Sequence, residues 1–323
     1  MSRNPAASPQ NQTFLGDKLV FIVGSQRSGT TILERLLAKH PALEHWYEPY
    51  FVWDYHLGHG EDDHRSTAQA IPAVTDFLRN EFERFWCASG AELIIEKSPE
   101  HCFRVPFVDQ VFPAARWIHI YRDGRDATLS IQKEWATRAA LVEGRSLKDL
   151  IALIRITLAR QPRLRNKIQL LNYELKGRLA SRRIGAFNKA KWGGAVGWGP
   201  RFKGWEAALE SGPLLRFNAL QWAHAVEAAL EGLALIPAER QLSLSYESLL
   251  DRPAETLSEV LRFLEVDEAP AETLGAELRR DNHGKWRHRY AEEELRVVED
   301  ALGALLKRLG YPLSKDESAH SPA

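Results

Sequence analysis

A glycine-bounded loop near the N-terminus has the residue types and spacing of an anion-binding site. The loop Gly24-Ser-Gln-Arg-Ser-Gly-Thr-Thr31 follows an apolar run and precedes apolar residues at helical spacing. Backbone N–H groups at such a strand-to-helix turn, together with the helix dipole, bind phosphate oxygens. The spacing is that of a nucleotide P-loop, but Thr30 stands where the P-loop has its lysine, and the cation is Arg27 instead. We therefore expect an anion site that is poorly suited to a nucleotide triphosphate with magnesium; a plain turn without a ligand is the alternative.

Two further charged groups come directly after apolar runs of strand length. They are Glu96-Lys97-Ser98-Pro99 and Arg122-Asp-Gly-Arg125, and Ser130 lies eight residues beyond Arg122, about two helical turns on. Ligands of open α/β sheets bind outside the carboxyl ends of the strands. We therefore expect Arg27, Lys97 and Arg122 to converge on one ligand.

The elements that position these groups alternate between strand and helix. Apolar runs predict strands near 18–23, 92–96, 116–121 and 241–246, and helical periodicity predicts helices over 28–39 and 291–309. This alternation favours an α/β protein with a three-layer, P-loop-like fold, in which helices flank a central parallel sheet. One domain over 14–313 is expected, with a mainly helical basic insertion at about 138–215 and disordered tails at 1–13 and 314–323.

Composition narrows the class of protein. The 323 residues carry 43 basic and 43 acidic side chains, which argues against a protein that coats nucleic acid. No apolar run near the N-terminus approaches the ~18 residues of a membrane span, and the polar start of the chain predicts no signal peptide. The two cysteines, Cys87 and Cys102, form no CxxC pair, so a reducing, cytoplasmic location is expected. An acidic and histidine-rich stretch has no recognised metal-ligand spacing, and no metal is expected there: Asp54, His56, His59, Asp62 and His64.

Taken together, these motifs resemble those of sulfotransferases that use 3′-phosphoadenosine 5′-phosphosulfate (PAPS). The similarity is to the bacterial and tyrosylprotein-type members, whose loop reads R-S-G-T-T. The matching segments, in chain order, are Arg27–Thr31, His40-Pro41, Glu96–Pro99, Arg122–Arg125 with Ser130, and Tyr246-Glu-Ser-Leu249. The resemblance covers about 18–135 and 240–310 and leaves the basic insertion unmatched.

The resemblance implies transfer of a sulfuryl group from PAPS to a hydroxyl acceptor by in-line displacement, without a metal. It implies that Glu48 is the general base and that Lys97 and Arg27 stabilise the transferred group and the leaving oxygen. Glu44 and His45 are the alternative candidates for the base. The implied donor-binding residues are Arg27, Ser28, Gly29, Thr30, Thr31, Arg122, Ser130, Tyr246 and Lys285. In this set Arg122 and Ser130 would hold the 3′-phosphate, and Lys285 belongs to a segment that closes over the donor.

Two other functions stay open at this point, an ATP-dependent P-loop kinase and a non-enzymatic binder of acidic partners. Residues 155–205 contain 13 Lys or Arg and one acid, Glu174, so their net charge is +12. This basic stretch, with Trp192, Trp198 and Trp205, is expected to frame the acceptor site and to favour an anionic or membrane-associated acceptor. Solvated helix faces, or charges paired with the acidic remainder of the chain, are the alternative.

Overall fold

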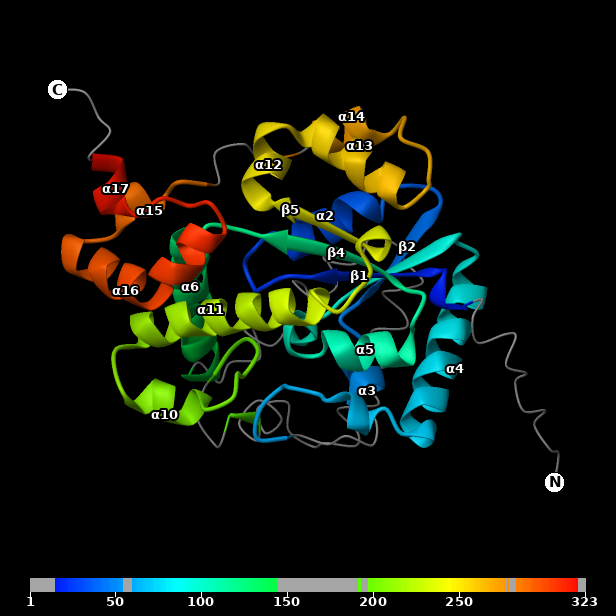
Figure 1. Ribbon diagram of the computed structural model, residues 1–323, viewed down its shortest axis with the longest axis horizontal. Helices are drawn as coiled ribbons and strands as arrows, with labels where there is room; N and C mark the ends of the chain where they lie inside the picture. The colour runs from blue at the N-terminus through cyan, green and yellow to red at the C-terminus, as the bar shows by residue number, and fades with distance from the viewer. Residues whose placement is uncertain are drawn as a thin grey trace. The chain divides into compact units, whose positions relative to one another are not determined.

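The computed structural model describes residues 15–54, 60–143, 191–192, 197–276, 278 and 283–318 (Figure 1). It consists of two compact units, one formed by Met1–Thr128 with Pro200–Ala323 and the other by Leu129–Gly199. The predicted insertion at about 138–215 overlaps the second unit but extends beyond its C-terminal end. Most of the basic residues of 155–205 lie outside the described residues, so the prediction of a mainly helical insertion stays a prediction.

Among the described residues, five parallel strands form one sheet in the first unit. They are β1 (Leu19–Val23), β2 (Leu43–Tyr47), β3 (Leu93–Lys97), β4 (Arg116–Tyr121) and β5 (Gln241–Ser245), in the order β2-β3-β1-β4-β5. In register, Phe21 of the central strand lies opposite Glu96 on one side and Trp117 on the other. The four predicted strands and the predicted α/β class, a parallel sheet between helices, are confirmed.

One face of the sheet is covered by helices that present aliphatic side chains. These are α2 (Thr30–Leu37), α12 (Tyr246–Asp251), α13 (Pro253–Phe263) and α14 (Ala271–Gly275), which Figure 1 shows on one side of the strands. Leu33 of α2 and Leu257 of α13 pack in one buried cluster with the strand residues Ile22, Ile95 and Ile118. The predicted helix over 28–39 is α2, and its end agrees with the proline of His40-Pro41.

The opposite face is covered by α3 (Tyr50–Trp53), α4 (Pro72–Ser89), α5 (Val105–Val111) and α11 (Leu214–Leu233) (Figure 1). Its core is aromatic. The fully buried ring of Phe21 lies with its centroid 5.2–6.0 Å from the rings of Trp53, Phe82, His101, Phe112 and Trp117. Large, rigid side chains thus anchor the central strand, whose carboxyl end continues into the glycine-bounded loop.

The remaining elements are η1 (Thr67–Gln69), η2 (Pro99–Phe103), α6 (Gly124–Glu143), α10 (Trp205–Glu210), η3 (Ala238–Arg240), α15 (Trp286–Arg289), α16 (Glu292–Arg308) and α17 (Ser314–Ser318). The predicted C-terminal helix is α16. The predicted tail from 314 onward is wrong for its first residues, because Ser314–Ser318 form a helix. The N–H and Oγ of Ser314 donate hydrogen bonds of 2.9 and 2.7 Å to the carboxylate of Glu299.

The second unit is described in part. Trp135 of α6 packs edge-on against the buried Trp192, with ring centroids 5.3 Å apart. Gly197 lies so close to the same indole that a Cβ there would be 2.0 Å from Trp192 Cδ2. Within this unit, therefore, Trp192 is a packing residue.

Two general features concern metals and membranes. In the described ranges no group of three His, Cys, Asp or Glu side chains could hold a metal ion; His56 and His59 lie outside those ranges. None of the helices that the structure describes is long and apolar enough to cross a membrane.

Candidate active site

The carboxyl edge of the sheet gathers the charged residues that the sequence singled out. Because all five strands are parallel, their carboxyl ends lie along one edge. Along that edge, in the spatial order of the strands, come Glu48 after β2, Lys97 at the end of β3, the loop 24–29 after β1, Arg122 after β4 and Tyr246 after β5. The loop therefore occupies the centre, with a lysine on one side and an arginine on the other.

The last residue of the central loop, Gly29, has a conformation and surroundings that favour glycine. Gly29, the residue before α2, has φ +96°, and a Cβ there would lie 2.4 Å from Tyr246 Cδ2. The buried atoms Gln26 Nε2 and Ser28 Oγ have no hydrogen-bond partner among the described residues. Buried polar atoms are almost always satisfied, so these two are available to a ligand at the helix N-terminus.

Arg27 differs from its neighbours in the loop. Its side chain is exposed, and its φ of +68° is one of three positive values among the described non-glycine residues. Thr30 is buried and Thr31 half-buried at the first positions of α2. The loop thus has an exposed cation, and two hydroxyl-bearing residues follow it at the start of the helix.

Lys97 and Glu48 form an ion pair at the sheet edge. Lys97 Nζ donates to Glu48 Oε1, and the side chains are 2% and 16% exposed. The other carboxylate oxygen, Oε2, accepts a hydrogen bond of 2.9 Å from the hydroxyl of Tyr50. Burial disfavours the ammonium form of Lys97, but the Glu48 carboxylate outweighs burial and raises the pKa of Lys97 above its usual value. The lysine is therefore a buried cation at neutral pH. Glu48 itself has φ +41°, which is unusual for a residue with a side chain.

The alternative bases, Glu44 and His45, lie within strand β2 rather than at its end. Both are buried, and His45 Nδ1 is 3.3 Å from Oε1 of the buried Glu34 on α2. Glu44 Oε1 accepts a hydrogen bond of 3.0 Å from the backbone N–H of His45. The strand β2 itself was not predicted from the sequence. Of the three candidate bases, Glu48 alone follows the strand and is partly exposed.

Arg122 lies beside the central loop, as predicted. Its Nη1 donates to the carbonyl oxygen of Arg27 at 3.3 Å, and its guanidinium carbon lies 4.7 Å from the ring centroid of Tyr246. Nη2 is 3.5 Å from Asp126 Oδ2. The guanidinium is thereby oriented from three sides. Ser130 belongs to the second unit, so its predicted place beside Arg122 stays a prediction.

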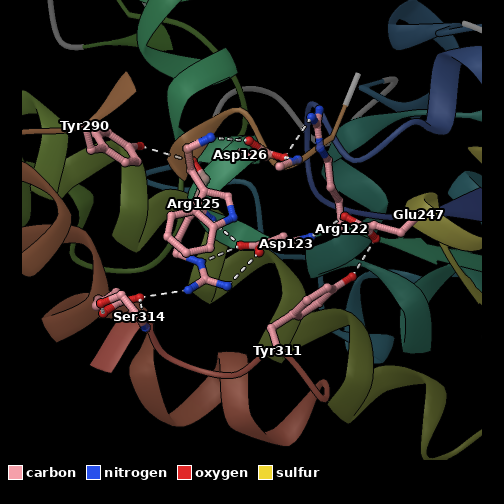
Figure 2. Close-up of polar contacts among 11 residues, drawn as sticks. Arg122, Asp123, Arg125, Asp126, Glu247, Tyr290, Tyr311 and Ser314 are labelled. Carbon is pink, nitrogen blue, oxygen red and sulfur yellow. Dashed lines mark hydrogen bonds and ion pairs between the residues drawn. The ribbon is translucent and has the colours of Figure 1, made fainter. Parts of the chain in front are cut away.

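The turn after Arg122 is the centre of a buried polar network (Figure 2). Nε and Nη2 of Arg125 donate to the two carboxylate oxygens of Asp123 at 3.0 and 2.8 Å, and Nη1 donates to Glu299 at 2.8 Å. Glu247 Oε1 accepts the N–H of Asp123 at 3.0 Å, while Oε2 accepts the hydroxyl of Tyr311 at 2.6 Å. Burial disfavours the charge on Arg125, but its carboxylate partners raise its pKa. Arg125 is therefore a structural cation.

The segment 283–290 is held against this turn. Asp126 accepts the backbone N–H groups of Gly284 and Trp286, and the Trp286 ring lies 3.6 Å from the Arg125 guanidinium carbon. Lys285, predicted to bind the donor, is exposed between these two anchored residues. Sequence reasoning missed Asp126, although its i,i+4 spacing from Arg122 was a signal for an ion pair.

Comparisons with known proteins point to one family. Residues 20–153 match the model of the Sulfotransferase family. Nodulation protein NoeE of Sinorhizobium fredii (strain NBRC 101917 / NGR234) is 26% identical over 133 residues, which cover 36% of this chain and 32% of NoeE. Omega-hydroxy-beta-dihydromenaquinone-9 sulfotransferase Stf3 of Mycobacterium tuberculosis (strain CDC 1551 / Oshkosh) is 24% identical over 169 residues, which cover 35% of this chain and 44% of Stf3. The chain thus spans less than half the length of these two relatives.

Among solved structures, the sulfotransferase domain from the curacin biosynthetic pathway aligns with a TM-score of 0.48 and 16% sequence identity, covering 91% of this chain and 98% of that domain. The family model includes strands β1 to β4, the central loop, Lys97 and Arg122. The match of residues 20–153 to the Sulfotransferase family model confirms the resemblance that the motifs indicated.

Proposed function

We propose that the protein is a PAPS-dependent sulfotransferase that transfers a sulfuryl group to a hydroxyl-bearing acceptor. The observation that carries this proposal is the row of groups at the carboxyl edge of the sheet. The ion pair joins Lys97, at the end of β3, to Glu48, which follows the edge strand β2. The central loop follows β1, and Arg122 follows β4. A donor with a 5′-phosphosulfate and a 3′-phosphate needs separate cationic groups for its two anionic ends, and this edge supplies them.

The central loop would hold the 5′-phosphate end of the donor. Its backbone N–H groups, the hydroxyls of Ser28, Thr30 and Thr31, and the positive end of the α2 dipole suit a phosphate. Ser28 Oγ and Gln26 Nε2, which have no hydrogen-bond partner in the part of the chain that the structure describes, support this fit. The loop has no P-loop lysine, and the exposed Arg27 offers its charge to the sulfuryl group instead.

Arg122 would hold the 3′-phosphate, because its planar guanidinium donates two parallel hydrogen bonds to phosphate oxygens. Tyr246, stacked against this guanidinium, would line the nucleotide. Ser130 and Lys285 are proposed as further 3′-phosphate and donor contacts. These residues would make the site selective for PAPS over ATP, because ATP has no 3′-phosphate.

The proposed chemistry begins with proton transfer from the acceptor hydroxyl to Glu48 Oε1. The acceptor oxygen attacks the sulfur in line as the bond from sulfur to the 5′-phosphate oxygen breaks. Lys97 and Arg27 stabilise the negative charge that develops on that oxygen, and 3′,5′-adenosine bisphosphate leaves. In the donor-free protein Lys97 neutralises Glu48; a donor phosphosulfate that draws Lys97 toward itself would release Oε1 to act as the base. Tyr50 would still hold Oε2.

The acceptor is proposed to carry a hydroxyl group, in agreement with the omega-hydroxy compound in the name of the relative Stf3. The basic residues of 155–205 favour an anionic or membrane-associated acceptor, and no nucleic-acid partner is proposed. A cytoplasmic location, where PAPS would be supplied, remains part of the proposal.

Ligand-induced stabilisation tests the donor. A ligand that binds only the folded state at 100 times its dissociation constant raises the free energy of unfolding by ~2.7 kcal/mol. We expect this increase with 3′,5′-adenosine bisphosphate, and less with 5′-AMP or with ATP and magnesium. Transfer of radiolabel from [35S]PAPS to a panel of hydroxyl acceptors then tests the activity. Stabilisation by ATP and magnesium, with none by the bisphosphate, would favour a kinase and overturn the proposal.

A further inference from the structure

Asp126 lies where three parts of the candidate site meet. It is buried in the first turn of α6, and its carboxylate accepts two backbone hydrogen bonds from the segment 283–290 (Figure 2). Oδ2 accepts the N–H of Gly284 at 2.5 Å, and Oδ1 accepts the N–H of Trp286 at 2.9 Å. Hydrogen bonds to a buried carboxylate are among the stronger ones in proteins. These two fix the main chain on either side of the exposed Lys285.

The same carboxylate also orients Arg122. Asp126 Oδ2 lies 3.5 Å from Arg122 Nη2, while Nη1 of that arginine donates to the Arg27 carbonyl. Asp126 Oδ2 therefore contacts both Arg122, the residue proposed to bind the 3′-phosphate, and the backbone N–H of Gly284. With the carboxylate removed, the guanidinium would keep its contacts to the loop and to Tyr246 but lose its ion pair with Asp126.

The neighbouring residue, Arg125, holds the segment independently of Asp126. Its guanidinium lies against the ring of Trp286, and its carbonyl oxygen accepts a hydrogen bond of 3.1 Å from the Tyr290 hydroxyl. The segment is thus attached to the turn through side chains as well as through its main chain. A variant at Tyr290 can therefore loosen the segment without replacing Asp126 or Arg122 themselves.

We propose that Asp126 is a positioning residue that couples the segment 283–290 to Arg122. It keeps the segment closed against the donor end of the sheet, and it sets the direction in which Arg122 donates. This inference rests on the proposed function for its ligand, 3′,5′-adenosine bisphosphate. The attachment of the segment 283–290 to Asp126 does not depend on the proposed function. This attachment can be measured in the ligand-free protein.

The test is Asp126→Asn, which keeps the shape of the side chain but leaves one acceptor oxygen for two N–H donors. Hydrogen–deuterium exchange reports the amides of Gly284 and Trp286 in the ligand-free protein. Titration gives the affinities for 3′,5′-adenosine bisphosphate and for 5′-AMP. We expect amide exchange to become about tenfold faster or more, as for the loss of one hydrogen bond to a charged group, and the bisphosphate to lose affinity by a similar factor relative to 5′-AMP.

The matched control is Asp109→Asn, on α5. Asp109 accepts a hydrogen bond of 2.8 Å from Arg240, which precedes the amino end of β5, so an equivalent ion pair is weakened at the opposite edge of the sheet. This control is expected to leave both amides and the ratio of the two affinities unchanged. If Asp126→Asn does not fold, Tyr290→Phe serves instead, with a smaller increase in amide exchange and a loss of bisphosphate affinity in the same direction.

The two readouts separate the possible failures. A wild-type protein that binds no bisphosphate overturns the proposed function, while amide exchange still shows whether Asp126 holds the segment. If the wild type binds the bisphosphate and Asp126→Asn preserves both slow exchange and the affinity ratio, the inference is wrong. Faster exchange with an unchanged ratio also contradicts it, because the segment would then be held but not coupled to Arg122.

Discussion

Replacing Glu48 with glutamine would remove the negative charge from the Lys97 ion pair while keeping the shape of the side chain. In the structure the carboxylate accepts from Lys97 through Oε1 and from Tyr50 through Oε2. The Lys97 side chain is 2% exposed, so its charge would be left with little water to solvate it. Breaking a buried ion pair by removing one partner costs about 3–5 kcal/mol. Glu48 is partly exposed and glutamine retains one acceptor oxygen, so we expect about 3 kcal/mol at most.

The same substitution would remove the proposed base. General-base catalysis contributes about 10²–10⁴ in rate, so kcat for sulfuryl transfer is expected to fall by that factor. Affinity for 3′,5′-adenosine bisphosphate should change little, because this product lacks the sulfuryl group that the base faces. Steady-state kinetics, bisphosphate titration and denaturant unfolding measure the three quantities separately.

Tyr50→Phe is the matched control for this experiment. It removes the hydrogen bond to Oε2 but keeps the carboxylate charge and the Lys97 pair. We expect kcat to stay within about tenfold of the wild type, in line with the loss of one hydrogen bond to a charged group. A near-normal rate in Glu48→Gln would refute the reasoning and transfer the role of base to Glu44 or His45.

Three further predictions concern the donor loop, the 3′-phosphate and pH. Arg122→Ala, and to a smaller degree Ser130→Ala, should weaken binding of 3′,5′-adenosine bisphosphate by about tenfold or more relative to 5′-AMP, as titration would show; equal losses would contradict the assignment. Gly29→Ala should lower the free energy of unfolding by about 1–3 kcal/mol, because φ is +96° and the new Cβ would overlap Tyr246; unchanged denaturant unfolding would argue against this loop geometry. Because the folded-state pKa of Lys97 is raised, its contribution to stability should be complete below the unfolded-state value of about 10.4 and decline as pH rises above it. Unfolding free energies compared between wild type and Lys97→Met across that range test this, and parallel curves would contradict it.

The sequence predicted four of the five described strands from their apolar residues, which are consecutive in β1 and alternate with serine in β5. Strands β1 and β3 are parallel and buried on both faces, so all of β1 and the first three residues of β3 show the continuous hydrophobicity expected of such strands. Strand β2 was missed because Glu44 and His45 interrupt its pattern. Glu34 on the preceding helix makes burial of His45 possible, and that contact is visible only once the chain is folded.

The candidate site was predicted in its positions but not in its pairings. The rule that ligands bind at the carboxyl ends of parallel strands placed Lys97 and Arg122 at one edge, and the fold agrees. The sequence could not show that Lys97 pairs with Glu48, since no spacing relates residues on different strands. Nor could it show the contacts of Asp126, whose backbone donors are 158 and 160 residues away.

The backbone at Arg27 and Glu48 has a consequence for how this protein can be altered. Of the three described non-glycine residues with positive φ, these two are the ones at the sheet edge, with values of +68° and +41°. A conformation of this kind costs of order 1–3 kcal/mol at a residue with a side chain, and glycine would relieve it. Selection for thermal stability alone would therefore favour glycine at both positions and remove the exposed cation and the carboxylate together. Under the proposed function, the retained strain at these two residues is a trade-off between stability and activity.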